Sequence, residues 1–506
     1  MSTLSTAVGL ERISRTSGYN IKKGHFNTAT QNLPQIIAIF GEANTANQSG
    51  LTVEKVEVTS AAEAGQLFGY GSPIHSVMRI LRPLSGDGVG GIPTIVFPQA
   101  TAGGASATVR GITVTGTATA NTTHTVVVNG RTSVDYQPYS FDVAIGDSPT
   151  VVATKIAGAI NSVLGAPCTA ASSAGVVTVT SKWKGTTSSQ LIVSISYKGH
   201  AAGLTYSQTT STNGAGSVDL SSSLSQFGDD WYTMVVNTYD AAQLAGLEQF
   251  NGVPDDTNPT GRYAGLMFKP FVAYFGSVLS DKDALAAITN DTDRISQVTN
   301  ALCAAPNSKG FTWEAAANVV ALASVTYQNS PQIDVSGFSY PDMPIPTNNI
   351  IGDMNDYNSR DFLVKKGCST VTLVNGAYQI QDLVTTYHPD GEVPLLYNYP
   401  RTLNIHFNVK DSYTTLERIY LKDKTLVADT QTVGVENCIK PKEWQAIVYT
   451  LFDEMADNAL INDPQFSKDS MQVQISLTNP NRFETTFNYK TTGTVRISST
   501  TAKAGF

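Results

Sequence analysis

Between two segments of ordinary α/β texture, residues 101–217 form a stretch that is almost free of charge. Only nine of these 117 residues are Asp, Glu, Lys or Arg, and Thr, Val and Gly dominate. Short runs of alternating apolar and polar residues are typical of half-buried strands. The stretch therefore predicts a β-rich domain inserted into another domain, with Gly/Ser-rich joints at 101–106 and 211–217. Its expected elements are strands at 107–117, 123–129, 136–143, 175–181 and 191–197, and one helix at 148–164.

The flanking segments alternate between apolar runs and helical patterns. Residues 33–41 and 92–98 are continuous apolar runs, which indicate buried strands. Between them, Ser60 can cap a helix at 61–68, and an apolar stripe predicts a second helix at 73–81. Strands that alternate with helices are typical of an α/β sheet. After residue 218 we expect strands at 230–237 and 271–275, another strand near Ala301, and helices at 239–250 and 313–323.

The last third of the chain carries clear turn and helix signals. A Pro-rich connection covers 331–346, and a helix at 359–366 ends at Gly367. Residues 441–460 form the clearest amphipathic pattern, with Pro441 suited to the first helical position. Expected strands are 371–374 and 378–383, joined at Asn375-Gly376, and then 471–477, 483–489 and 494–499.

These patterns predict a multidomain α/β (α+β) protein, which the length of 506 residues also favours because single cores rarely grow so large. Residues 21–100 and 218–489 form the two parts of a core domain with a mixed sheet. Residues 101–217 form the inserted β-rich domain. The ends, 1–20 and 490–506, are extended arms. The N-terminal arm is either a frayed terminus or a strand that needs an edge from elsewhere. The C-terminal arm carries a short Thr-rich strand pattern that also has no obvious local partner.

Charge is sparse over the whole chain. Charged residues make up 15% of the sequence, against about 25% in an average globular protein. The low charge either leaves neutral surface for contacts between copies or reflects Thr-rich strands, and composition alone does not separate the two. The net charge is −8 and no run of five like charges occurs, so we expect no nucleic-acid partner. The N-terminus lacks signal-peptide features and no apolar run approaches 18 residues. We therefore expect assembly in the cytoplasm without secretion or membrane contact.

Residues that could carry chemistry are scattered. Cys168, Cys303, Cys368 and Cys438 show no metal or redox spacing, so we expect reduced, mostly buried thiols, with a crosslink between subunits as the alternative. Residues 86–91 fit G-x-G-x-x-G but precede a strand instead of opening a helix, which favours a turn over a dinucleotide site.

Other catalytic patterns are equally weak. No two of the six histidines lie within four residues of each other, and no P-loop, G-x-S-x-G or H-E-x-x-H motif occurs. Candidate carboxylates occur in three acidic pairs, Asp229-Asp230, Asp255-Asp256 and Asp291/Asp293. Their sequence settings are typical of turn and cap residues. We therefore expect no catalytic residue, metal or cofactor.

The order of several motifs resembles the tail sheath family of contractile phages, nearest its Mu-like branch. The most specific piece is AEAGQLFGYGSPIH at 62–75. The chain departs from the pattern at 381–383, where many relatives carry an Arg, which leaves an ionic contact at that position without its usual partner. The other similar pieces are Val8-Gly9 and 18–21, LPQIIAIFGEA at 33–43, FDVAIGD at 141–147, GCST at 367–370, LVTTY at 383–387, and 487–497.

The resemblance implies a structural subunit that polymerises helically in stacked rings around an inner tail tube. The arms of one subunit add strands to the sheet of a neighbour, so that main-chain hydrogen bonds link the subunits. Contacts of this kind that do not close produce an open helical polymer. The implied inter-subunit strand residues are Val8, Leu10 and Ile13 in the N-terminal arm and Phe487, Tyr489, Val495 and Ile497 in the C-terminal arm.

The resemblance also implies a contraction from a metastable extended lattice, which drives the tube through the host envelope while the arms act as hinges. The inserted domain faces outward, and the helix with Glu443, Trp444 and Asp453 lies near the tube. The implied partners are further copies of the chain, a tail tube protein, and baseplate and tail terminator or neck proteins. The implied location is the tail sheath of a virion that assembles in the host cytoplasm.

Two other interpretations stay open. One is a different self-assembling structural or virion protein, such as a pilus, S-layer or capsid-associated protein, although the missing signal peptide opposes the first two. The other is a carbohydrate-acting enzyme with a β-rich binding insert, which needs paired carboxylates and exposed aromatic residues in a cleft. The four tryptophans mostly lie in apolar patterns and read as core, which disfavours this enzyme. They are Trp183, Trp231, Trp313 and Trp444.

Overall fold

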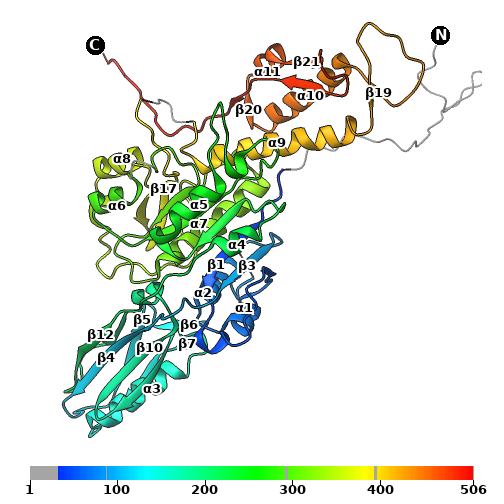
Figure 1. The fold of residues 1–506 in the computed structure, drawn as a ribbon. Helices are drawn as coiled ribbons and strands as arrows, with labels where there is room; N and C mark the ends of the chain where they lie inside the picture. Colours follow the sequence, from blue (N-terminus) through cyan, green and yellow to red (C-terminus); the bar gives the residue numbers. More distant parts are fainter. Residues whose placement is uncertain (1–31, 87, 291–293, 392–395, 505–506) are drawn as a thin grey trace, which may run out of the picture.

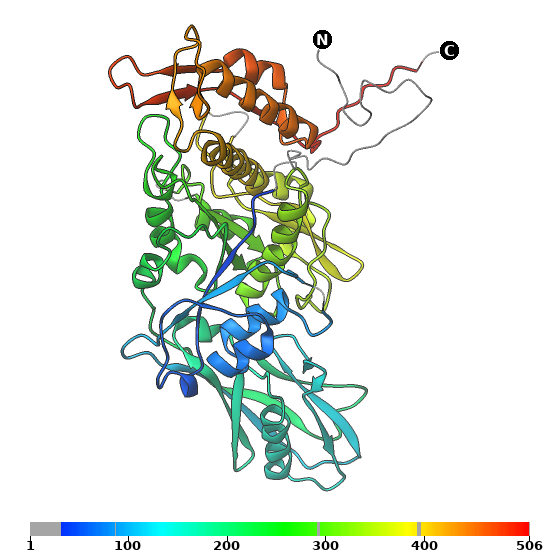
Figure 2. The ribbon, with the colours of Figure 1, turned by 90° about the vertical axis from the view of Figure 1, so that its right-hand side faces the viewer.

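The computed structural model describes residues 32–86, 88–290, 294–391 and 396–504. Figure 1 shows three units in succession along an elongated molecule: a β-rich unit, a central unit with helices around a sheet, and a helical C-terminal unit. The view after a quarter turn shows the same succession (Figure 2). The mixed α/β class predicted from the sequence is confirmed.

The central unit is built on a six-stranded sheet in the order β15-β14-β13-β1-β3-β2. Its five longer strands are parallel, and the short edge strand β2 is antiparallel. Every residue of β1 is buried, as expected for a strand covered on both faces. The strands are β1 (Ile37–Glu42), β2 (Val56–Glu57), β3 (Thr94–Gln99), β13 (Met234–Asn237), β14 (Val272–Ser277) and β15 (Asn300–Ala304).

Helices cover both faces of this sheet because successive side chains of a strand point to opposite faces. Ile39 belongs to a core shared with α1, α2 and α7, and the next residue, Phe40, belongs to a core shared with α4 and α5. Burying one such side chain stabilises the fold by about 2–3 kcal/mol. The helices are α1 (Ala61–Phe68), α2 (Pro73–Leu81) and α7 (Thr312–Asn329) on one face, and α4 (Ser221–Ser225) and α5 (Leu244–Asn251) on the other.

Local sequence signals set several of these elements. Ser60 accepts a hydrogen bond from the backbone N–H of Glu63 at 3.1 Å, which confirms the predicted cap of α1. Asn375 and Gly376 both have positive φ and join two strands in a tight hairpin, as their dipeptide predicts. The hairpin and its neighbours are β16 (Thr370–Val374), β17 (Ala377–Asp382), α6 (Lys282–Thr289) and α8 (Tyr357–Lys365).

The β-rich unit contains a four-stranded sheet, β12-β4-β10-β9, and a three-stranded sheet, β11-β5-β8. One helix, α3 (Pro149–Asn161), contributes to a core that is separate from the two cores of the central unit. The unit is entered and left through paired backbone at Ser106 and Ala215. Its longer strands are β4 (Ala107–Thr115), β5 (Thr122–Val128), β8 (Ser140–Val143), β9 (Cys168–Ser173), β10 (Val176–Lys184), β11 (Val193–Tyr197) and β12 (Thr205–Thr212).

Two details of this unit differ from the sequence prediction. The expected strand at 136–143 is split, because Asp135 and Tyr136 both have positive φ and form the turn between β6 (Ser133–Val134) and β7 (Gln137–Pro138). Strands β9 and β12 were not predicted. Their residues are mostly Ser, Thr and Ala, so they carry little of the apolar alternation from which a strand is recognised.

The C-terminal unit packs around α10 (Pro441–Asp457), which the sequence predicted. It also contains α9 (Pro400–Tyr420), the longest helix among the described residues, which the sequence analysis missed. Leu403 and Phe407 of α9 pack in the central core, whereas Ile405 and Val409 pack in the C-terminal core. A helix that divides its apolar residues between two cores shows no single apolar stripe, which is the usual sequence signal.

The remaining elements of the C-terminal unit are short. Residues 494–499, expected as a strand, have no strand partner in the described part of the chain. The short elements are β18 (Thr425–Leu426), β19 (Cys438–Ile439), β20 (Ile461–Asn462), α11 (Pro464–Ser470), β21 (Gln472–Ile475), β22 (Phe483–Thr486) and β23 (Lys490–Thr491).

Two further observations concern the class of protein. Over the described residues, no helix combines the length and apolar character that crossing a membrane requires. The four cysteines form no disulfide within the chain, and Cys168, Cys303 and Cys368 are buried as expected, whereas Cys438 is partly exposed.

Gly276 in β14 allows a direct test of the packing between the sheet and α7. A Cβ added at this position would lie 1.7 Å from the carbonyl oxygen of Thr312 at the start of α7. We expect Gly276→Ala to lower the free energy of unfolding by about 3 kcal/mol, measured by urea denaturation with tryptophan fluorescence. The matched control is Gly158→Ala in α3, where no heavy atom lies within 4 Å of the new Cβ. The control should stabilise by about 0.5–1 kcal/mol, and equal midpoints for the two variants would contradict the packing.

Candidate functional site

The carboxyl ends of the parallel strands are the edge at which open α/β sheets normally bind ligands. In this chain β1 ends at Glu42 and the neighbouring β13 ends at Asn237. The edge is occupied by a turn of the β-rich unit, the 3-10 helix η2 (Thr186–Gln190), which contacts an acidic side chain at the end of β1 and another just after β13.

Glu42 is the first of these acids and is 2% exposed. The hydroxyl of Thr187 donates to Glu42 Oε2 at 2.8 Å and accepts from Trp183 Nε1 at 3.0 Å. Burial raises the pKa of Glu42 to about 7, and the Thr187 hydrogen bond opposes that shift. The carboxyl group is therefore an internal contact between β1 and η2.

Asp240 is the second acid and lies just beyond β13 with a φ of 50°. Gln190 Nε2 donates to its Oδ2 at 2.6 Å, and the hydroxyl of Thr312 donates to its other oxygen. The Gln190 amide oxygen accepts from the backbone N–H of Thr312 at 2.9 Å. Burial of the carboxyl group raises the pKa of Asp240 to about 7. This network ties the β-rich unit to the sheet edge and to the start of α7.

A second joint between the same units is ionic. Arg131 of the β-rich unit contacts Asp342 at 2.5 Å and Glu314 of α7 at 3.2 Å, and the Glu314 side chain is 4% exposed. Arg79 of α2 contacts Asp135 at 2.6 Å. Removing one partner of such an enclosed pair typically costs about 3–5 kcal/mol, because the other charge stays buried and unpaired. The two joints hold the β-rich and central units as one body.

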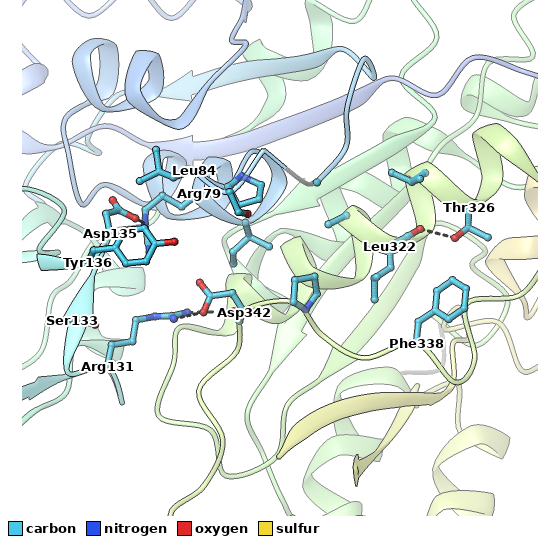
Figure 3. Close-up of a pocket in the computed structure, with 17 residues that line it drawn as sticks. Arg79, Leu84, Arg131, Ser133, Asp135, Tyr136, Leu322, Thr326, Phe338 and Asp342 are labelled. Carbon is cyan, nitrogen blue, oxygen red and sulfur yellow. Dashed lines mark hydrogen bonds and ion pairs between the residues drawn. The ribbon is translucent and has the colours of Figure 1, made fainter. Parts of the chain in front are cut away.

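A cavity of about 700 Å³ lies beside the ionic joint, lined by α2, the β6–β7 hairpin, α7 and the 338–342 loop. Figure 3 shows Asp342 against Arg131 and Asp135 against Arg79, with Tyr136 and Leu84 near them. The charged groups that line the cavity are thus paired with one another. The Tyr136 side chain is 85% exposed. A carbohydrate-acting enzyme needs a carboxyl pair free to work on a substrate, and the acids of this cavity do not provide one.

The other candidate positions have structural roles. Asp230 pairs with Lys55, and Asp255 accepts from the backbone N–H of Thr257 at 2.8 Å as a turn residue. Gly86, Gly88 and Gly90 have positive φ in the turns before β3. Within the described ranges, no group of three or more His, Cys, Asp and Glu side chains is placed to hold a metal ion. Asp291, Asp293 and His25 lie outside the described residues.

The predicted arm residues fall into three groups. Val8, Leu10 and Ile13 lie outside the described residues. Val495 and Ile497 are 91% and 86% exposed. Phe487 and Tyr489 instead pack inside the C-terminal unit. The centres of the Phe487 and Phe452 rings are 5.2 Å apart, and the Tyr489 hydroxyl lies 2.7 Å from His406 Nδ1.

The residues predicted to lie near an inner tube also differ in position. Trp444 is fully buried, and its Nε1 donates to the Thr485 hydroxyl at 3.2 Å, so its side chain offers no surface to a partner. Glu443 is exposed and accepts from the backbone N–H of Lys440 at 3.0 Å, which caps α10. Asp453 is exposed and pairs with Lys468 at 2.5 Å. Of these three residues, only Glu443 and Asp453 are therefore surface groups that a partner could contact.

Sequence reasoning missed one functional candidate, Arg496. Its guanidinium bridges Asp334 and Asp382, and it is the arginine that supplies an ionic contact at the 381–383 position. The available signal was the alternation of Val495, Arg496 and Ile497. In an extended segment, this alternation places the charged residue on one face and the two apolar residues on the other. The partner on β17 lies 114 residues away in the sequence and cannot be found from that pattern.

No protein-family model matches the chain. The chain is 22% identical over 463 residues to the Mu-like prophage FluMu tail sheath protein of Haemophilus influenzae, and the match covers 89% of each chain. Two solved structures are also similar. A sheath tail protein of Desulfitobacterium hafniense matches 94% of this chain and 100% of its own, at 10% identity and a TM-score of 0.43. The anti-feeding prophage helical sheath in its contracted state matches 97% and 100%, at 8% identity and a TM-score of 0.44.

The Glu42 contact predicts a pH-dependent joint. Because its folded-state pKa is raised, the neutral carboxyl stabilises the fold below about pH 4.5, and this contribution is lost as the pH rises through about 7. Glu42→Gln stays neutral, so its stability relative to the original chain should rise by roughly 3 kcal/mol between pH 4.5 and pH 8. Denaturation at the two pH values measures this difference.

Glu63→Gln is the matched control for this experiment. Glu63 caps α1 from the surface, and its hydrogen bonds with Thr59 lower its pKa, so the pH dependence of this variant has the opposite sign. Parallel pH profiles for Glu42→Gln and the original chain would contradict a buried, neutral Glu42.

Proposed function

We propose that the chain, which is similar to a Mu-like prophage tail sheath protein, is the structural subunit of a contractile tail sheath. The observation that carries this function is the 22% identity over 89% of both chains. A match of 463 residues has to include parts of all three units, so it concerns the whole architecture and not one shared domain. The subunit forms a helical polymer of its own copies in a phage, prophage or phage-derived particle.

In the proposed domain organisation, the sheath core domain combines the central unit with most of the C-terminal unit. Residues 21–100 and 218–489 form the sheath core domain, and residues 101–217 form an inserted outer domain with its own apolar core. Residues 1–20 and 490–506 are the linking arms. Since β23 pairs with β20 inside the C-terminal unit, the part of the C-terminal arm that is available to a neighbour begins after Thr491.

Open strand edges in the C-terminal unit support linkage through the arms. β21 and β22 form a two-stranded sheet, and in the described part of the chain no third strand joins it. Val473 and Phe483 of this hairpin pack on the core that contains α10. A sheet of two strands is only marginally stable, and its edges are templates for further strands. We propose that arms of neighbouring subunits add to these edges by β-augmentation.

The contraction mechanism uses rigid bodies joined by these arms. The buried contacts of Glu42, Asp240 and Arg131 hold the outer and core domains together, so both move as one unit. The arms keep neighbours connected while the lattice changes from a metastable extended form to a contracted one, which drives the tube through the host envelope. A few kcal/mol of new contact per subunit is sufficient, because many subunits change together.

The proposed partners follow from the same role. Further copies form the polymer, a tail tube protein lies inside it, and baseplate and tail terminator or neck proteins meet its ends. We propose that the exposed side of α10, with Glu443 and Asp453, lies near the tube. The role is structural and not enzymatic, in line with the sheath relative.

Electron microscopy of the purified chain tests the function. We expect hollow, striated tubes from the full chain, with tail tube protein supplied as template if needed. A chain without residues 1–20 and a chain without residues 493–506 should each fold but stay unassembled, because the linking strands are lost while β23 is kept. A full chain that stays monomeric even with tube protein would refute the sheath function.

The tube contact is tested separately. We expect Glu443→Gln and Asp453→Asn together to weaken cosedimentation with tube protein several-fold at low salt, since each exposed charge contributes about 0.5–1 kcal/mol. Gln can still cap α10, so self-assembly should not change. The matched control is Asp361→Asn, which removes an exposed acid paired with Lys365 on α8. A control that weakens tube binding equally would contradict the assignment to α10.

A further inference from the structure

The C-terminal segment begins after β23 with one backbone contact, in which the Thr492 N–H donates to the Leu460 carbonyl oxygen at 3.2 Å. Its other contacts described below are made by side chains. Thr492 is bound by Arg401, whose guanidinium nitrogens contact the Thr492 carbonyl oxygen at 2.7 Å and its hydroxyl at 2.9 Å. Four residues later, Arg496 contacts Asp382 at 2.8 Å and also pairs with Asp334. These two anchors fix the path of the segment between residues 492 and 496.

The guanidinium group of Arg496 lies in a site that is largely shielded from solvent. The Arg496 side chain is 19% exposed, Asp334 is 10% exposed and Asp382 is 23% exposed. The guanidinium carbon lies 3.8 Å from the centre of the Tyr399 ring, a cation–π contact. The planar guanidinium can bridge two carboxylates and stack on a ring at once, which a lysine cannot do. Arg496 forms ion pairs with both carboxylates, and Arg401 also interacts electrostatically with Asp334.

The residues on either side of Arg496 behave in the opposite way. Val495 is 91% exposed and Ile497 is 86% exposed. In an extended segment, neighbouring side chains point to opposite faces. While Arg496 binds its own subunit, the opposite face of the segment therefore presents two aliphatic side chains to solvent.

We propose that Arg496 is a register pin, which holds the C-terminal segment on its own subunit so that Val495 and Ile497 form a contact surface for a second copy of this chain. This inference rests on the proposed sheath function. The alternation allows both contacts at once, because the face that binds Asp334 and Asp382 is not the face that meets the neighbour.

The second copy is the occupant that the chemistry of the segment favours. Two exposed aliphatic residues with a spacing of two fit the face of a strand that packs on an apolar layer. The C-terminal unit offers such a layer, since Val473 and Phe483 of the open β21–β22 sheet pack on the α10 core. A strand that brings Val495 and Ile497 to this sheet would continue the same apolar face.

A double-mutant cycle on the unassembled full chain tests the pin itself. Arg496→Gln and Asp382→Asn should each lower the melting temperature by a few degrees, because each leaves charged groups of the cluster unpaired. The double variant should melt no lower than the worse single variant. The control is Arg482→Gln, which removes an arginine that is 66% exposed and pairs with Glu484. Additive effects, or no effect of Arg496→Gln, would overturn the pin.

Tube assembly tests the surface that the pin presents. Arg496→Gln and the pair Val495→Ser/Ile497→Ser should each raise the critical concentration at least tenfold, and the serine pair should leave the melting temperature unchanged. Val435→Ser, at a valine that is 69% exposed, is the matched control and should assemble normally. Normal assembly of the serine pair would overturn the contact surface. Failure of the original chain to form tubes, even with tube protein, would refute the sheath function, while the melting cycle still decides separately whether the pin exists.

Discussion

The architecture depends on how the β-rich unit closes the carboxyl edge of the central sheet. Thr187 and Gln190 of η2 bind Glu42 and Asp240, the acids that follow two adjacent parallel strands. In open α/β folds this edge is usually left free for a ligand. Here its polar groups are used within the chain, so a position that carries chemistry in many folds serves as a joint between two units. The raised pKa of both acids is the physical mark of that enclosure.

The proposed sheath function requires a stiff body and adaptable ends. The joint at Glu42 and Asp240 and the ionic joint at Arg131 provide the stiff body. The C-terminal end differs in kind. After β23, Thr492 makes one backbone hydrogen bond to Leu460, and the side chains of Arg401 and Arg496 hold the chain without a strand partner among the described residues. Side-chain anchors of this kind can fix a segment in place and still leave its backbone hydrogen-bonding groups available to a neighbour.

Several elements were predictable because their signals are local. Ser60 with the pattern that follows it specifies the start of α1, and Asn375-Gly376 specifies a hairpin. Helix α9 was missed because its apolar residues serve two cores, with Phe407 in one and Ile405 in the other. The candidate site followed the same division. The resemblance supplied Val495 and Ile497, which are exposed, whereas the packing of Phe487 and Tyr489 and the burial of Trp444 came from partners distant in the sequence.

The sequence by itself determined the mixed α/β class, the charge-poor β-rich stretch, most long elements and the resemblance to sheath proteins, because periodicity, capping residues and motif order lie along the chain. Only the tertiary structure decided that Glu42 and Asp240 are enclosed by η2 and that Arg496 meets Asp334 and Asp382. Thr187 is 145 residues from Glu42, and Arg496 is 162 residues from Asp334. Contacts at such separations are formed by the packing of whole units, and no local pattern encodes which of many polar side chains will meet.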